Sequence, residues 1–300
     1  MKFWASVAFA PIDQYAALAT AAEEAGYFGM LLADHLVSVR NPVSRYPYSV
    51  DGMVPWGPEA PFPDPWVAIA SLAATTQTLR FGSSVYVAPA RDLLTVAKAV
   101  GTAAVLSGDR VTFGVGAGWM EDEFVLTGQQ FSRRGERLDE MLDVLRKLWS
   151  GGWVDHAGTF YTLPGVQMKP APAATVPIWA GGYSEPALRR ATKRCDGWVG
   201  VAADPEQATN IISRIHQLLA TQGRDPQEFD VVFSVPGPLD VAAVTRWEEL
   251  GVTGLIARPW ANRLTAAPDS LLIAQRDVSL GEKLEATSRF GEEVVRHFSS

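Results

Sequence analysis

The feature that most constrains this chain is a regular alternation of short β-rich runs with helical patterns. Such alternation predicts a parallel sheet whose faces are covered by helices. The candidate strands are Lys2–Ala8, Phe28–Ala33, Arg80–Val87, Val111–Gly116, Val176–Ala180, Gly197–Val201, Asp230–Val235 and Gly254–Arg258. Because these eight units are placed almost evenly and no dinucleotide glycine fingerprint follows the first, we expect a closed (β/α)8 TIM barrel rather than an open doubly wound sheet.

Helix boundaries support this division of the chain. Asp64-Pro65 and Asp204-Pro205 each place an N-cap acid before a proline at the first helical position, where its missing N–H costs nothing. From Leu138 to Trp149 the apolar residues follow a 3.6-residue period that ends at Gly151. Since α/β barrels commonly run to about 250 residues as one unit, we expect residues 1–300 to form a single domain.

Three connections are too long to be simple turns. They are residues 36–63, which are rich in proline and aromatics, residues 117–131, and residues 153–172, which carry an expected small hairpin. Long ordered loops on a barrel usually shape the active site. We therefore expect a barrel with insertions in its βα loops.

Composition narrows the class of partner. A formal net charge of -7 argues against nucleic acid, because phosphate binding needs a basic face. The single Cys195 is expected in the core, and the four histidines have no metal-ligand spacing, so no metal is expected. The first residues read as a strand rather than a signal peptide, and no run approaches the ~20 apolar residues that span a membrane. These observations predict a cytoplasmic protein with a small-molecule substrate.

Candidate functional residues follow the strands, because barrel enzymes carry their chemistry where strands end. His35 follows the second strand beside Asp34, and imidazole can donate or accept a proton near neutral pH. The alternative is a histidine that is simply hydrogen-bonded at a strand end. Its position at the rim favours a catalytic role.

The loop after the fifth strand suggests a phosphate site. Gly181 and Gly182 let the backbone approach a ligand, and Ser184 opens a helix whose free N–H groups face outward. Arg189 and Arg190 follow one turn later. The same pattern is also an ordinary way to turn a βα corner, so both readings stay open.

The loop after the fourth strand contains Gly114, Gly116 and Gly118, which lack dinucleotide spacing and would instead admit a flat ring. The acids at positions 121–123 could supply a general acid or a metal ligand. Three adjacent acids at a helix start are more typical of an exposed, dipole-favoured turn. We therefore expect this acidic run to be exposed.

Several of these runs together resemble the bacterial luciferase-like flavin oxidoreductases, in particular the actinobacterial branch that uses the deazaflavin coenzyme F420. They include Ala33-Asp34-His35, Tyr46-Pro47-Tyr48-Ser49, Gly114-Val115-Gly116-Ala117-Gly118-Trp119 and Pro177-Ile178-Trp179-Ala180-Gly181-Gly182. The similarity covers nearly the whole chain up to about Val201.

The resemblance implies a cofactor ring in the barrel mouth, over a bulge with a non-proline cis peptide at Ser84-Val85. It implies His35 as the active-site histidine and a homodimer as the assembly. The implied cofactor contacts are Asp34, Ser84, Val85, Val87, Ala117, Gly118, Asp122, Gly181, Gly182 and Ser184. The acidic tail of F420 would need cations, for which Arg189, Arg190, Lys193 and Arg194 are candidates.

One departure bears on the substrate. The sugar-phosphate dehydrogenases of this family have a glutamate where this chain has Trp119, so Trp56, Trp119 and Glu121 are expected to line a pocket for an apolar or aromatic molecule. The leading hypothesis is hydride transfer between F420 and such a molecule, with His35 as proton donor. The alternatives are a reduced-FMN monooxygenase that uses oxygen and a non-catalytic flavin-binding barrel. A metal-dependent hydrolase is disfavoured because no strand end shows paired histidines.

Overall fold

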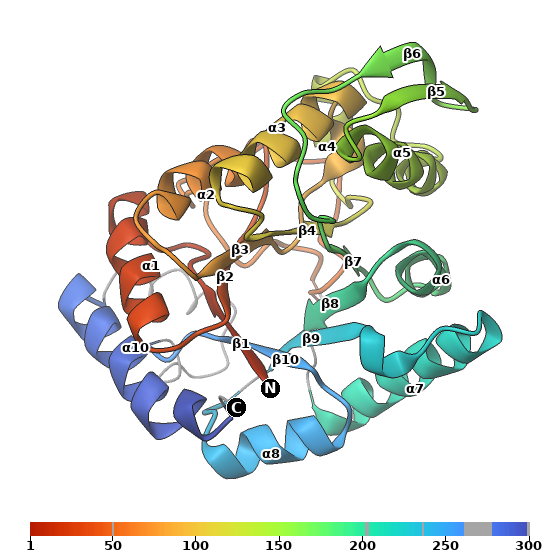
Figure 1. Ribbon diagram of the computed structural model, residues 1–300. Coiled ribbons are helices and arrows are strands. Elements are labelled where there is room, and N and C mark those ends of the chain that lie inside the picture. The colour runs from red at the N-terminus through yellow and green to blue at the C-terminus, as the bar shows by residue number, and fades with distance from the viewer. Residues whose placement is uncertain (50, 202–203, 236, 261–277, 299–300) are drawn as a thin grey trace.

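The structure is a computed structural model that describes residues 1–49, 51–201, 204–235, 237–260 and 278–298. Eight parallel strands of these residues close into a barrel in the order β1-β10-β9-β8-β7-β4-β3-β2, with helices on the outside (Figure 1). The strands are β1 Lys2–Ser6, β2 Gly29–Leu32, β3 Arg80–Ser83, β4 Val111–Val115, β7 Ile178–Gly181, β8 Gly197–Val201, β9 Asp230–Ser234 and β10 Gly254–Ala257. The predicted TIM barrel is confirmed.

Most of the predicted strands ran too far at one end or both. The third shows why, since the expected run Arg80–Val87 leaves the ladder after Ser83. A non-proline cis peptide joins Ser84 to Val85, as the resemblance implied, and Tyr86 then returns as an isolated bridge to Val115. β-propensity alone does not mark such a departure, because every residue from Ser83 to Val87 suits a strand.

The helices begin as their caps predict. The side chains of Asp64 and Asp204 accept backbone N–H groups at the starts of α2 and α7. The helices are α1 Tyr15–Glu24, α2 Pro65–Ala73, α3 Leu93–Leu106, α4 Glu121–Leu126, α5 Arg134–Trp149, α6 Glu185–Arg194, α7 Pro205–Thr221, α8 Val241–Glu249 and α10 Leu280–Glu293. The apolar residues Leu284, Phe290, Val294 and Phe298 predict a closing helix over residues 282–298, but α10 ends at Glu293 and a 3-10 turn, Val295–His297, follows it. Residues 264–279 show no clear helix or strand pattern, and most of them lie outside the described residues.

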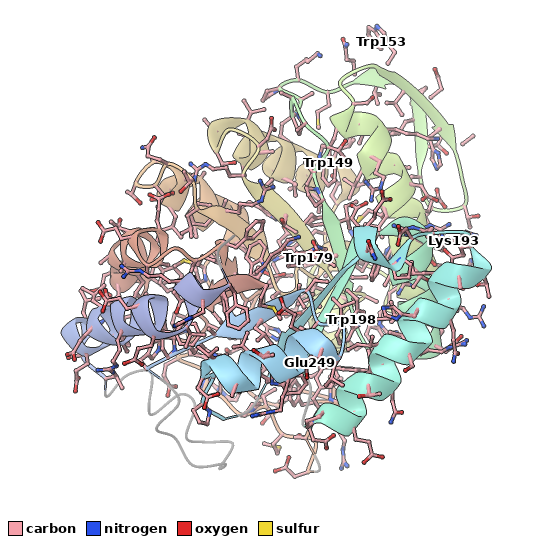
Figure 2. The ribbon with its side chains drawn as sticks, turned by 60° about the horizontal axis from the view of Figure 1, so that its bottom comes forward. Trp149, Trp153, Trp179, Lys193, Trp198 and Glu249 are labelled. Carbon is pink, nitrogen blue, oxygen red and sulfur yellow. The ribbon has the colours of Figure 1, made fainter. Side chains whose placement is uncertain are left out.

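Two apolar layers hold the barrel. One lies between the strands and the helices, and the other fills the interior with Trp4, Leu31, Trp179, Val199, Val232 and Ile256. The Trp4 and Trp179 rings meet edge to face with centroids 5.0 Å apart, and Trp179 lies among the strands in Figure 2. Val85 packs on top of this interior layer. The interior is therefore solid, and the side chain of Val85 forms the floor of the barrel mouth.

The expected hairpin is present as β5, Trp153–Ala157, and β6, Thr162–Gln167, which pair antiparallel. Glu140 of α5 holds it, because its carboxylate accepts backbone N–H groups from residues 159–161 and contacts His156 Nε2 at 3.0 Å. Trp153 stands at the outer edge of the molecule (Figure 2). Among the described residues, no helix is long and apolar enough to cross a membrane.

Candidate active site at the barrel mouth

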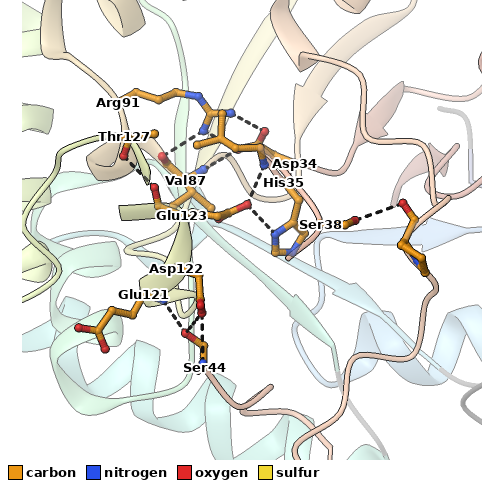
Figure 3. Close-up of polar contacts among 12 residues, drawn as sticks. Asp34, His35, Ser38, Ser44, Val87, Arg91, Glu121, Asp122, Glu123 and Thr127 are labelled. Carbon is orange, nitrogen blue, oxygen red and sulfur yellow. Dashed lines mark hydrogen bonds and ion pairs between the residues drawn. The ribbon is translucent and has the colours of Figure 1, made fainter. Parts of the chain in front are cut away.

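A buried carboxylate contacts the predicted catalytic histidine. His35 Nδ1 lies 3.1 Å from Glu123 Oε1, and the Leu36 N–H donates to the same oxygen at 2.7 Å (Figure 3). The Glu123 side chain is 1% exposed and that of His35 is 13% exposed. The expectation that the whole acidic run is exposed was therefore wrong for Glu123. Helical spacing held a signal for this, since Glu123 shares the buried face of α4 with Met120 and Phe124.

A second buried carboxylate ties the second strand to the third. Arg91 Nη1 and Nη2 each donate to an Asp34 carboxylate oxygen at 2.8 Å, and the Val87 N–H donates to Asp34 at 2.9 Å. Burial raises the pKa of the Asp34 carboxyl, and the Arg91 guanidinium opposes that rise. The Arg91 guanidinium also lies over the Tyr86 ring, 4.0 Å from its centroid. The Asp34 carboxylate is thus engaged within the protein, and its cofactor contact stays a prediction.

The glycines after the fourth and fifth strands make room for Val85. A Cβ added at Gly181 would lie 2.9 Å from Val85 Cγ1, and one added at Gly116 would lie 2.7 Å from Val85 Cγ2. Real Cβ atoms do not sit so close to a packed side chain. These glycines therefore serve the floor of the mouth, which the sequence did not indicate. A bulky residue at Gly181 would displace Val85 before it reached any ligand.

The start of α6 has no side-chain cap, a feature it shares with the starts of α1, α4 and α5. Asp64, Asp92, Asp204, Asp240 and Ser279 all cap their helices with a side-chain hydrogen bond, whereas Ser184 makes none. Gly182 leads into this corner with φ +110°, a conformation that favours glycine. Ser184 is exposed. The first turn of α6 therefore offers its backbone N–H groups and a free hydroxyl at the rim, where the sequence predicted a phosphate site.

Three of the α6 cations are bound by acids of the protein, and only Arg189 reaches the start of the helix. Arg190 is buried and binds Asp139 of α5 at 2.6 Å, and Arg194 binds Asp143 at 3.1 Å. Arg189 pairs with Glu185 at 2.8 Å. Lys193 is exposed but lies near the end of the helix, about 12 Å from its start at 1.5 Å per residue. The expected cationic group for an acidic tail is therefore not assembled at the mouth.

Aromatic rings surround His35. Its ring centroid lies 5.3 Å from that of Trp56, 5.0 Å from that of Phe62 and 5.7 Å from that of Trp119. The predicted pocket residues Trp56 and Trp119 are thus brought together at the histidine. A further contact joins Tyr48 of the long loop to Tyr183 after β7, with centroids 5.7 Å apart. The long loop therefore lies across the mouth from β2 to β7.

The remaining predicted residues take different places. Asp122 accepts the N–H groups of Val43 and Ser44 and the Ser44 hydroxyl, so its carboxylate holds the long loop (Figure 3). These hydrogen bonds outweigh partial burial and lower the pKa of Asp122. Glu121 is exposed beside it.

Backbone and buried positions complete the set. Gly118 has φ +83° and its carbonyl accepts from Arg134 Nε at 2.8 Å, while Ala117 beside it is half-buried. Cys195 is buried, as predicted, and burial raises the pKa of its thiol to about 12. The described part of the chain contains no group of three or more His, Cys, Asp or Glu side chains that could hold a metal ion.

The chain matches a known protein family and several related proteins over most of its length. The family model described as luciferase-like monooxygenase matches residues 4–268. Rv0940c, an uncharacterized protein of Mycobacterium tuberculosis, is 37% identical over 257 residues, which are 85% of this chain and 88% of that protein. The match to the family model and the identity to this relative both span most of the barrel.

Two further likenesses have named activities. The F420-dependent hydroxymycolic acid dehydrogenase of M. tuberculosis is 28% identical over 71% of this chain, and the match spans 56% of that enzyme. Among solved structures, the monooxygenase RslO1 from Streptomyces bottropensis superposes with a TM-score of 0.74 at 18% identity, over 100% of both chains. At that identity the likeness to RslO1 supports the fold alone.

Proposed function

The chain belongs to the luciferase-like monooxygenase family, and from this premise we propose that it is an F420-dependent oxidoreductase that transfers hydride to or from an apolar or aromatic small molecule. The observation that carries the proposal is the surroundings of His35. One ring nitrogen is held by a buried carboxylate, and aromatic rings enclose the rest of the side chain. Such a histidine is placed to exchange a proton with a substrate in a pocket that excludes water.

The mouth fits a flavin or deazaflavin at two places. The uncapped start of α6, with Ser184, can hold the ribityl phosphate that F420 and FMN share. The apolar floor at Val85 and the neighbouring glycines leaves a smooth surface for a flat ring. When bound, the cofactor supplies the atom that accepts or donates hydride. The residues of this chain bind it, orient the substrate and move the proton.

The choice of F420 over FMN rests on the resemblance and on F420-dependent relatives. The α6 arginines no longer support it, because they bind acids of α5 or of α6 itself. The second candidate is a reduced-FMN monooxygenase, which the family description favours. In that case His35 would still hold or move a proton beside the bound flavin. A non-catalytic flavin-binding barrel would keep the α6 site without needing His35.

Turnover assays separate these candidates. Purified protein is mixed anaerobically with oxidised F420 and a panel of alcohols with apolar or aromatic groups, and loss of the visible F420 absorbance is followed. The proposal predicts substrate-dependent reduction without oxygen. Substrate-dependent oxygen uptake with reduced FMN, and no reaction with F420, would instead establish the monooxygenase. We further propose that the protein works in the cytoplasm and forms a homodimer. Light scattering of the purified protein tests the homodimer.

A further inference from the structure

We propose that Glu123 positions His35 by holding its ring proton on Nδ1, so that Nε2 is the nitrogen that works on the substrate. The importance of this contact for turnover rests on the proposed function. The contact itself concerns only residues of the folded chain, so it can be tested without cofactor or substrate.

The hydrogen bonds at one oxygen decide the direction of the contact. Glu123 Oε1 accepts the Leu36 N–H at 2.7 Å and lies 3.1 Å from His35 Nδ1. An ionised carboxylate only accepts hydrogen bonds. Because Glu123 Oε1 already accepts the Leu36 N–H, it is a poor position for a proton and acts as an acceptor toward the histidine ring as well. The proton shared with the ring therefore sits on Nδ1. The other nitrogen, Nε2, is then free of a proton whenever the ring is neutral.

Nothing else near the ring competes for Nε2. Its closest ring neighbours are Trp56, Phe62 and Trp119, which bring no charge. The nearby charges are already satisfied, since Asp34 and Arg91 bind each other. Glu121, from the same helix as Glu123, is exposed. Among the described residues His35 Nε2 has no hydrogen-bond partner, so it remains available to a bound molecule.

This arrangement fits proton transfer in both directions. If a substrate hydroxyl were oxidised here, His35 Nε2 would take its O–H proton and become part of an imidazolium, while the bound cofactor would supply the acceptor for the C–H hydride and a carbonyl would remain. The Glu123 carboxylate then faces that positive charge through Nδ1. In the reverse direction Nε2 returns the proton to the oxygen. A carboxylate that orients an imidazole through its other nitrogen has this role in many active sites.

The test is nitrogen NMR of the ¹⁵N-labelled protein without cofactor, at about pH 9, where an ordinary imidazole is neutral. A His35→Gln variant assigns the His35 signals. In the unmodified chain the ring proton is expected on Nδ1. In Glu123→Gln it is expected to stay there, because the amide oxygen can accept from both Leu36 and His35. In Glu123→Leu the Nδ1 preference is expected to be lost.

Asp122→Asn is the matched control, because Asp122 lies beside Glu123 but binds the long loop instead of the histidine. Its His35 signals should match those of the unmodified chain. A ring proton found on Nε2 in the unmodified chain would overturn the proposal, whether or not Glu123→Leu folds. A preserved Nδ1 preference in folded Glu123→Leu would overturn it as well.

Turnover supplies the second readout. Glu123→Gln keeps the geometry but removes the charge, so kcat should fall while KM stays near its original value. The fall should be about 10–100-fold, the range seen when a group that orients a metal-bound imidazole is removed. If the NMR result is as expected but no F420 reaction is found, the proposed function fails and the positioning stands. If F420 turnover occurs and Glu123→Gln leaves kcat unchanged, the positioning proposal fails.

Discussion

The two halves of the barrel mouth are built in opposite ways. On the β2–β4 side, buried acids are satisfied inside the protein, with Asp34 bound by Arg91 and Glu123 bound by His35 and Leu36. On the β7–α6 side, Ser184 leaves its helix uncapped and its hydroxyl unused. The first half is therefore fixed before any ligand arrives, whereas the second keeps its donors for one.

This difference matches the role proposed for each half. A group that transfers protons must be held in place in advance, because a small displacement of it loses much of the rate. A group that binds phosphate must have free donors. In a capped helix, the N-cap side chain already accepts a hydrogen bond from the first N–H groups. Five helices have a side-chain cap, whereas α1, α4 and α5 lack one as α6 does, so the phosphate site proposed at α6 depends on its place after β7 at the rim.

The largest expected effect concerns the fixed half. His35→Ala should lower turnover by about 10²–10⁴-fold, because it removes a positioned acid/base. Cofactor affinity should change little, since the proposed phosphate site lies on the other half. Single-turnover rates and cofactor titrations of the same variant measure both. If the variant keeps its single-turnover rate, His35 only lines the pocket and takes no part in proton transfer.

The next effect concerns the stability of that half. Arg91→Ala should destabilise the protein by about 3–5 kcal/mol, because it leaves the Asp34 carboxylate buried without its cation. Arg133→Ala is the matched control, since Arg133 pairs with Glu136 at the surface, where solvent screens such pairs and they contribute little to stability. Urea unfolding of both variants gives the two values. Equal losses would mean that the Asp34 contact is not the tie between β2 and β3 described above.

The smallest effect compares two N-cap serines. Ser184→Ala should weaken cofactor binding by about 10-fold, because a hydroxyl hydrogen bond to phosphate is lost, and should leave stability unchanged. Ser279→Ala should do the reverse, since Ser279 forms a capping box with Glu282 and its loss costs about 1 kcal/mol. Thermal unfolding and cofactor titration of each variant test this crossing. If Ser184→Ala lowers stability as Ser279→Ala does, the two helix starts are alike.

The sequence predicted the fold well because the fold depends on local signals. Asp64-Pro65 and Asp204-Pro205 start helices by capping chemistry, and the period from Leu138 to Trp149 marks α5. His35 and Ser184 were found because a barrel places its strand ends on one rim. The family resemblance supplied the cis peptide at Ser84-Val85, which no local pattern indicates.

The sequence did not predict contacts between distant segments. Glu123 sits in an acidic run typical of an exposed turn, and although its spacing with Met120 and Phe124 signals burial, nothing local indicates its contact with His35, 88 residues away. Arg190 and Arg194 have the right charge for an acidic tail, but Asp139 and Asp143 of α5 bind them. Gly181 suggested a close ligand, yet the atoms it makes room for belong to Val85. Each of these outcomes is set by a neighbour that the local pattern does not contain.

The most direct test of the account is equilibrium binding of F420 and of FMN to the unmodified protein, measured by fluorescence titration at one pH and at two salt concentrations. The account predicts that both bind, because they share the ribityl phosphate, and that F420 has the lower Kd at each salt concentration. FMN binding as tightly as F420 or more tightly would contradict the F420 assignment and favour the monooxygenase. Failure of both to bind would contradict the assignment of the α6 start as a phosphate site.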